Sequence, residues 1–277
     1  MDKMREKLYE ARWYSKEIEK VATDPKVKKL AMEQTSVLTQ ALGGSVIEGI
    51  KKEEPKIEVP QGQMGARLDW YPKAIRHVRE MKTKGKYAKG WPLGAVVHFT
   101  AGRDGAAKTI DGGIKNGYCF TCIQKDGTMV QAHPISRWGY HAGESAWKTL
   151  TGAVSDDLIG IEINNAGRVT SVTNGTFKTW FGTYLKADEV RFTPGRENQL
   201  KGWYEKYTPA QEKTLIEFLI WLKRQAPEVF SFDHCLGHDE VAGPLGIGRW
   251  RKNDPGAALS MTMNELRALL KKKYAEG

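Results

Sequence analysis

The segment DLIGIEINN (157–165) is the most regularly patterned stretch near the middle of the chain. Its three isoleucines alternate with Gly160, Glu162 and Asn164. Because successive side chains of a β-strand point to opposite faces, strict alternation is typical of a strand. We therefore expect a strand with one apolar face, and with the carboxylate of Glu162 on the other face, directed into a cleft.

Further strands are predicted on both sides of this segment. LGAVVHFT (93–100) is an apolar strand, and FSFDHCLGHDEV (230–241) is a late strand that runs into a glycine-rich loop. YCFTCIQKDGTMVQAHP (118–134) predicts a β-hairpin, because Asp-Gly between two apolar runs is a turn signal.

Helical patterns are interspersed with these strands. In YTPAQEKTLIEFLIWLKRQ (207–225), Thr208 caps the helix, Pro209 takes its first position and Gln211 completes a capping box. MTMNELRALLKKKY (261–274) predicts a closing helix, and YPKAIRHVREMK (71–82) a short one. Strands mixed with helices predict an α/β fold with a mixed central β-sheet flanked by helices.

The first part of the chain has a different pattern. Apolar residues at helical spacing predict helices over 4–22 and 27–41, which together would form a helical hairpin. The expected layout is a helical segment (1–50), a polar linker broken by prolines (51–68) and a main domain (69–277). The hairpin is expected to bind a protein partner, to self-associate or to pack on the main domain.

Charge and hydropathy restrict the class of partner. The net charge is +10, of which +9 lies after residue 60, and this favours a polyanion such as nucleic acid, a membrane surface or an acidic cell wall. No nucleic-acid-binding motif is recognised, and no apolar run reaches the length of a membrane span. The charged N-terminal segment lacks the pattern of a secretory signal, so we expect the protein to accumulate in the cytoplasm.

The three cysteines are too few for a disulfide framework. Cys119 and Cys122 fall in the predicted hairpin, where alternation would send them to opposite faces. We expect two ordinary buried thiols rather than a shared metal site.

Three residues at junctions between strand and loop form a candidate metal site. His98 ends one predicted strand, His238 follows another, and Asp254 lies in an Asn-Asp-Pro-Gly turn. A catalytic zinc takes three such ligands and keeps one position open. A single histidine at the end of a strand is more often structural, so the prediction depends on all three meeting.

Six segments in this order resemble the zinc-dependent N-acetylmuramoyl-L-alanine amidases, a family that includes amidase-type bacteriophage lysozymes and peptidoglycan recognition proteins. They are VVHFTAG (96–102), GYCFTCIQKDGTMVQ (117–131), WGYHAGES (138–145), IGIEINN (159–165), GHDEVAG (237–243) and RKNDPGAAL (251–259).

The resemblance implies a role for each matching residue. His98, His238 and Asp254 would bind Zn²⁺, and His234 would be a structural bystander on a strand. Glu162 would act as general base. Further roles follow at three sites: Lys252 stabilising the oxyanion, Tyr118 donating a hydrogen bond to the same oxygen, and His141, Ala142 and Gly143 contacting substrate at the cleft rim.

The implied activity is hydrolysis of the amide between N-acetylmuramic acid and L-alanine in peptidoglycan, by a bacteriophage endolysin that a holin-type protein would release to the cell wall. The alternatives are a non-catalytic peptidoglycan-binding module, a zinc peptidase that cuts within the stem peptide, and a virion-associated protein. The sequence departs from the family pattern in the loop segment PLGIG (244–248) and in an expansion (165–207). Aromatic residues of this expansion would either line a groove for glycan or stem peptide or fold the expansion onto the domain. They are Trp180, Phe181, Tyr184 and Trp203.

Overall fold

The chain divides into two units, residues 1–65 and residues 66–277, and the fold described here is that of the second unit. The computed structural model describes residues 29, 33, 67–148, 150, 153–173, 175–197, 199–243 and 251–277. Apart from residues 29 and 33, the predicted N-terminal helices lie outside the described residues, as do most of the predicted linker and the segment PLGIG. The domain layout therefore stays a prediction.

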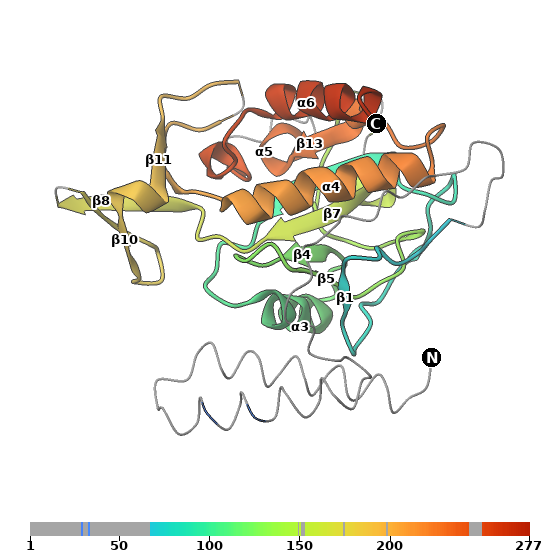
Figure 1. Cartoon of the computed structure of the whole chain (residues 1–277), viewed down its shortest axis with the longest axis horizontal. Coiled ribbons are helices and arrows are strands. Elements are labelled where there is room, and N and C mark those ends of the chain that lie inside the picture. Colours follow the sequence, from blue (N-terminus) through green and yellow to red (C-terminus); the bar gives the residue numbers. More distant parts are fainter. Residues whose placement is uncertain are drawn as a thin grey trace, which may run out of the picture. The chain divides into compact units, whose positions relative to one another are not determined.

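A six-stranded mixed sheet forms the centre of the second unit (Figure 1). Its middle strands, β3 and β7, run parallel, with His98 beside Glu162, and β13 continues the parallel set on the other side of β3. The strand order is β1 (Ile75–Arg76), β5 (Met129–Gln131), β4 (Thr121–Ile123), β7 (Leu158–Ile163), β3 (Gly94–Phe99) and β13 (Cys235–Gly237).

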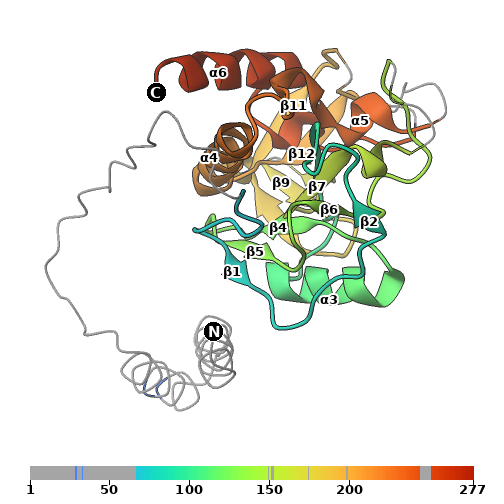
Figure 2. The same cartoon turned by 90° about the vertical axis from the view of Figure 1, so that its right-hand side faces the viewer.

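Helices cover both faces of this sheet, as Figure 2 shows. Helices α4 (Pro209–Gln225) and α6 (Met263–Ala275) pack on the face that carries Val97 and Ile161, and form the largest apolar core. Helix α3 (Ala106–Asn116) packs on part of the other face. The predicted α/β class with a mixed central sheet flanked by helices is confirmed.

Short elements complete the unit. A two-stranded sheet pairs β2 with β6, and the helix α5 directly follows β13. The bounds are β2 (Gly85–Lys86), β6 (Arg137–Trp138) and α5 (His238–Val241), and the described residues also form 3₁₀ turns at Val154–Asp156, Ala187–Glu189, Phe232–His234 and Gly256–Ala258.

Local signals predicted several elements correctly. Helix α4 begins with the expected capping box, in which Thr208 accepts from the backbone N–H of Gln211 and the Gln211 side chain accepts from that of Thr208. Strands β4 and β5 form the expected hairpin, and Gly127 at its turn has a φ of 85°, which favours glycine.

The predicted helix over 71–82 is wrong. This segment runs extended beside β5: β1 pairs with β5, and the backbone N–H groups of His77 and Met81 donate to Gln131 and Ala132. Its apolar residues do not share one buried helical face, because Tyr71 and Met81 are buried in two different clusters and Ile75 is exposed. Pairing with the edge of the sheet satisfies the backbone instead.

Helix α3 was missed because its sequence contains two glycines, which are poor helix formers. Packing explains one of them. A Cβ at Gly113 would lie 2.8 Å from the Phe120 ring and 2.6 Å from the Met81 methyl group. The close approach of the helix to the sheet therefore requires glycine.

The late strand is shorter than predicted. Only Cys235–Gly237 is strand, so His234 lies in a 3₁₀ turn rather than on a strand. Its backbone packs closely on Gly94, where an added Cβ would lie 2.2 Å from the carbonyl oxygen of His234.

The three cysteines are free and buried, as expected for ordinary thiols. Cys119 and Cys122 nevertheless share one apolar cluster instead of lying on opposite faces. The expectation failed because β4 begins at Thr121, so strand alternation does not extend back to Cys119.

The expansion after β7 folds into a five-stranded antiparallel sheet at the left of Figure 1. Its own small core contains Phe177, Leu185 and Val190, with Trp203 packed against them. The order is β10 (Tyr184–Lys186), β9 (Thr176–Lys178), β8 (Arg168–Thr173), β12 (Gly202–Glu205) and β11 (Val190–Thr193).

Among the helices of the described ranges, none is long and apolar enough to cross a membrane.

Candidate metal centre

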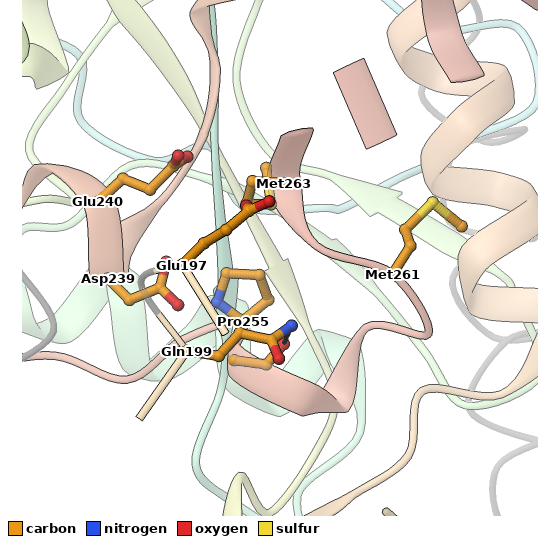
Figure 3. A pocket seen from close by; sticks show the side chains of 8 residues that line it. Glu197, Gln199, Asp239, Glu240, Pro255, Met261 and Met263 are labelled. Atoms are coloured by element: carbon orange, nitrogen blue, oxygen red, sulfur yellow. Dashed lines mark hydrogen bonds between the residues drawn. The ribbon is translucent and has the colours of Figure 1, made fainter. Parts of the chain in front are cut away.

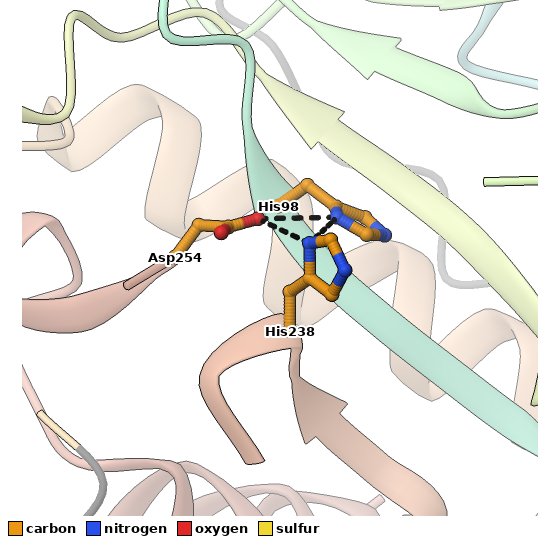
Figure 4. A group of neighbouring side chains, drawn as sticks. All are labelled: His98, His238 and Asp254. Atoms are coloured by element: carbon orange, nitrogen blue, oxygen red, sulfur yellow. Dashed lines mark hydrogen bonds and ion pairs between the residues drawn. The ribbon is translucent and has the colours of Figure 1, made fainter. Parts of the chain in front are cut away.

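The three predicted ligands meet at the carboxyl ends of the parallel strands (Figure 4). His98 comes from β3, His238 starts α5 directly after β13, and Asp254 lies in the loop before the 3₁₀ turn at 256–258. All three are buried. The Nδ1 atoms of the histidines are 3.0 Å apart, and Asp254 Oδ2 lies 3.1 Å from His98 Nδ1 and 3.0 Å from His238 Nδ1.

The hydrogen bond behind His238 determines which of its nitrogens faces the cluster. His238 Nε2 lies 3.2 Å from the carbonyl oxygen of Ala142. A carbonyl oxygen only accepts, so Nε2 carries the proton. In the neutral ring, Nδ1 then presents a lone pair toward His98 and Asp254.

A second chain of hydrogen bonds does the same for His98. His141 Nε2 donates to the carbonyl oxygen of Leu158 at 2.9 Å, so Nδ1 of a neutral His141 is an acceptor. His98 Nε2 lies 3.2 Å from that Nδ1 and must donate to it. The Nδ1 atom of His98 therefore carries no proton and also presents a lone pair, toward His238 and Asp254.

Gly160 in β7 makes room for this arrangement. A Cβ at Gly160 would lie 2.6 Å from Cγ of His141. The glycine in the LIGIEI strand therefore lets His141 approach the sheet and reach His98.

Two imidazole lone pairs and a carboxylate oxygen thus converge with no proton between them, an arrangement that a cation would stabilise. A tetrahedral ion with bonds of about 2.0–2.1 Å separates its ligand atoms by roughly 3.3 Å, close to the distances seen here. Two imidazoles and one carboxylate are ligands that zinc accepts in catalytic sites. Among the residues that the structure describes, this is the one cluster of histidine, cysteine or acidic side chains with such spacing.

Electrostatics favours the neutral histidines. Burial, followed by the charge of His238, lowers the pKa of His98 to about 4. Burial and the neighbouring His98 also hold the pKa of His141 well below its usual range. Burial raises the pKa of Asp254, but the neighbouring His238 and His98 outweigh burial, so this pKa lies below its usual range.

Glu162 lies next to His98 across the strand pair, on the same face of the sheet. Its Oε2 is buried and has no hydrogen-bond partner among the described residues. Burial, followed by the charge of Asp254, raises the pKa of Glu162 to about 8, and the charge of Lys252 acts in the opposite direction. A buried carboxylate oxygen without a partner is suited to accept a proton from a bound water.

The other predicted residues differ in their positions. Lys252 is close enough for its charge to lower the pKa of both His98 and Glu162. Tyr118 is 50% exposed after α3, and none of the contacts described for it reaches the three ligands. Gly143 is exposed at the surface, with a φ of 60°.

His141 and Ala142 each contact one of the ligand histidines. Each of them accepts a hydrogen bond from a ligand histidine, and the second nitrogen of His141 is held by Leu158. Their predicted substrate contact is untested, but these bonds give both residues a role in orienting the ligands. The sequence pattern carried no signal for this role.

Sequence reasoning also missed the contacts that hold the ligand-bearing segments. The backbone N–H of Asp239 donates to the carbonyl oxygen of Asp254, which joins the two segments directly. Arg267 of α6 forms a buried two-pronged ion pair with Glu240 and also donates to the carbonyl oxygen of Cys235. These partners are far apart in the sequence, so no local motif contains them.

A small pocket lies beside these supports and apart from the three ligands (Figure 3). Three acidic side chains, Glu197, Asp239 and Glu240, line it together with Gln199, Pro255, Gly256, Met261 and Met263. The acidic lining is unfavourable for an anionic ligand. It also does not offer three ligand atoms close enough for a metal, as the triad does.

Comparisons with known proteins point to one family. A family model described as N-acetylmuramoyl-L-alanine amidase matches residues 88–257, which is more than half of the chain and includes every predicted ligand. A search of curated protein sequences found no match.

Several solved structures are similar to the chain. The endolysin N-acetylmuramoyl-L-alanine amidase LysCS from Clostridium intestinale URNW is 19% identical, with a TM-score of 0.44, over 73% of this chain and 98% of that one. AmpDh3 from Pseudomonas aeruginosa, solved with anhydromuramic pentapeptide, is 18% identical, with a TM-score of 0.42, over 70% and 65%. AmpD from Citrobacter freundii is 20% identical, with a TM-score of 0.39, over 74% and 94%. These scores are too low to carry an argument, so the assignment rests on the family model.

Proposed function

Because the chain belongs to the N-acetylmuramoyl-L-alanine amidase family, we propose that it hydrolyses the amide between N-acetylmuramic acid and L-alanine in peptidoglycan with Zn²⁺ at His98, His238 and Asp254. The observation that carries this proposal is the convergence of two imidazole lone pairs and a carboxylate beside the partnerless oxygen of Glu162.

Amide hydrolysis needs an activated water, a stabilised carbonyl oxygen and a protonated leaving amine. A zinc ion held by the triad supplies Lewis acidity, which lowers the pKa of water and polarises the carbonyl. Glu162 takes the proton from the attacking water and passes it to the amide nitrogen, so that the C–N bond breaks and a free amine leaves. Burial raises the pKa of Glu162 to about 8, whereas the positive charge of Lys252, and of a cation bound at the triad, would act in the opposite direction.

Two further residues have supporting roles in this proposal. Lys252 stabilises the negative charge that develops on the carbonyl oxygen, in keeping with its electrostatic influence on Glu162. Tyr118 donates a hydrogen bond to the same oxygen. Its side chain is half-exposed after α3.

The test is digestion of purified peptidoglycan followed by mass spectrometry of the soluble products. We expect free stem peptides with an N-terminal L-alanine. Removal of the metal should abolish their release, and Glu162→Gln should slow it by about 10²- to 10⁴-fold.

Other outcomes would replace the proposal. Cleavage between stem-peptide amino acids would indicate a zinc peptidase. Tight binding to peptidoglycan without any cleavage, unchanged by a chelator, would indicate a recognition module.

The biological setting is a further part of the proposal. The net charge of +10 supports action on an anionic cell wall. In this proposal the protein is a bacteriophage endolysin, and a holin-type protein gives it access to peptidoglycan. Expression in a susceptible bacterium should cause lysis only after the inner membrane is permeabilised. Lysis without permeabilisation, or no lysis after it, would contradict this setting.

A further inference from the structure

The expansion sheet has two parts with different surroundings. The two strands at one end of the sheet, β12 and β11, support the metal-ligand loop: Arg191 of β11 donates to the carbonyl oxygens of Ala257 and Ala258, and Tyr204 of β12 packs on Gly256. Gly256 has a φ of 48°, and a Cβ there would lie 2.5 Å from the Tyr204 ring. Among the hydrogen bonds of the described residues, none links this loop to the outer strands, which are the three at the other end of the sheet: β8, β9 and β10.

The outer strands carry aromatic side chains that the small core does not use. Leu185 and Phe177 are buried in that core, and alternation places Tyr184 and Lys178 on the opposite face. Tyr184 is 59% exposed, and Lys178 lies beside it with its ammonium 5.6 Å from the ring centre.

Trp180, in the turn between β9 and β10, is the most exposed of the large hydrophobic residues described, at 73%. It is nevertheless held in place, because its indole N–H donates to the carbonyl oxygen of Ala101 at 2.7 Å. Phe181 lies edge-on to it, with ring centres 5.4 Å apart. An indole that is fixed through its polar edge and otherwise exposed is suited to stack against a flat ligand.

The acceptor Ala101 connects this turn to the metal centre. Ala101 follows His98 by three residues, so its Cα lies within about 11 Å of that of His98. The backbone N–H groups on either side, at Thr100 and Gly102, donate to Ile163 and Asn165 at the end of β7. Trp180 is thus anchored to the segment that leaves the site.

The exposure of these rings is not explained by stability. Phe177 and Trp203 stabilise the expansion by packing together, with ring centres 4.6 Å apart, whereas Trp180 and Tyr184 leave most of their surface in water. Trp180 and Phe181 lie together, and grouped apolar rings that stay exposed mark a binding surface.

We propose that Trp180 and Tyr184 form a platform that binds sugar rings of the glycan strand next to the cleaved muramoyl residue. This inference rests on the proposed function, in which the scissile amide hangs from a sugar within a polymer. The sugar residues next to the cleaved muramoyl residue must then lie along the protein surface beside the metal centre. The C–H face of a pyranose stacks on an indole or phenol ring, and Lys178 adds positive charge that suits a polymer with anionic stem peptides.

The test compares Trp180→Ala, Tyr184→Ala and the matched control Phe192→Ala in the full chain. Phe192 is exposed on the same sheet, but it packs on Trp203 and so belongs to the core face. The probe is a peptide-free glycan strand of alternating N-acetylglucosamine and N-acetylmuramic acid, titrated by calorimetry. We expect Trp180→Ala to weaken binding about tenfold and Tyr184→Ala by a smaller factor, whereas the control should bind like the wild type.

A kinetic measurement separates the platform from the reaction. The wild type and Trp180→Ala are compared on long glycan chains with stem peptides and on a single muramoyl peptide. The loss of kcat/KM should be at least about fivefold greater on the long chains. Thermal unfolding of each variant checks that the sheet remains folded, and Tyr184→Ala tests the same surface without removing the bond to Ala101.

The outcomes distinguish the two proposals. If the wild type cleaves the amide but neither variant changes glycan binding, or if Trp180→Ala affects both substrates equally, the platform is wrong and the amidase stands. If Trp180→Ala weakens the binding of free stem peptide instead, the platform is also wrong. If glycan strands bind through Trp180 but no substrate is cleaved, the platform stands and the proposed reaction fails.

Discussion

Ile161 and Glu162 are neighbours in β7, yet they lie in opposite environments. Ile161 is fully buried against α4 in the largest apolar core. Glu162 lies on the other face, with one carboxylate oxygen buried and without a partner among the described groups. The same contrast holds between Val97 and His98 in the paired strand.

This difference teaches how one sheet serves two purposes. Burying an ionisable group without a partner costs stability, and such costs are tolerated at functional sites when the rest of the fold compensates. Here the compensation comes from the α4 face, where isoleucines and valine exclude water. The two faces should therefore respond differently to substitution.

The largest effect is expected at the ligands. His238→Ala removes one of three converging ligand atoms, so we expect loss of stoichiometric zinc after dialysis and a fall in amidase activity of at least about 10³-fold. Metal content by mass spectrometry and product release measure the two effects. The matched control is His234→Ala, which lies four residues upstream and outside the triad. If the control loses zinc to the same extent, the ligand assignment fails.

An intermediate effect is expected one layer behind the ligands. His141→Ala removes the acceptor of the His98 N–H and should weaken zinc binding by about 10- to 100-fold. At saturating zinc, most of the activity should return with an unchanged KM. A raised KM with normal zinc affinity would instead support substrate contact by His141.

A smaller effect concerns stability and pH in the metal-free protein. The pKa of Glu162 is about 8 in the folded protein and near 4.5 in the unfolded chain. Between pH 4.5 and 8, Glu162 is therefore protonated in the folded state and ionised in the unfolded state. This contribution is complete below pH 4.5 and is lost as the pH rises through 8. His98, with its pKa lowered to about 4, has the opposite effect, but only below pH 6.5.

Between pH 6.5 and 8, the free energy of unfolding should therefore fall by roughly 1 kcal/mol per pH unit at most because of Glu162. Urea unfolding at both ends of this window measures the slope. The Glu162→Gln variant should lack this part of it. Equal slopes in both proteins would argue against the raised pKa.

The smallest effect is expected on the apolar face. Ile161→Val removes one buried methylene and should lower the free energy of unfolding by about 1 kcal/mol. Turnover per folded molecule should stay unchanged, because the side chain points away from the site. A change in kcat comparable to that of a ligand variant would break the contrast between the two faces.

Local patterns in the sequence predicted the elements that carry local signals. The alternation in 157–165, the capping box at Thr208 and the turn at Gly127 each involve residues close in the chain. Where tertiary contacts compete with local preference, prediction failed. The segment 71–82 pairs with a sheet edge instead of forming a helix, and α3 forms despite Gly112 and Gly113.

The three candidate metal ligands were found from the sequence because each lies at a junction between strand and loop and because the surrounding segments resemble the amidase family. What only the tertiary structure decided is how these ligands are oriented and what surrounds them. The donation from His98 to His141, the Arg267–Glu240 pair and the bond from Trp180 to Ala101 join residues 27 to 79 positions apart. Such contacts leave no periodic trace in a sequence, because their partners are neighbours only after the chain has folded.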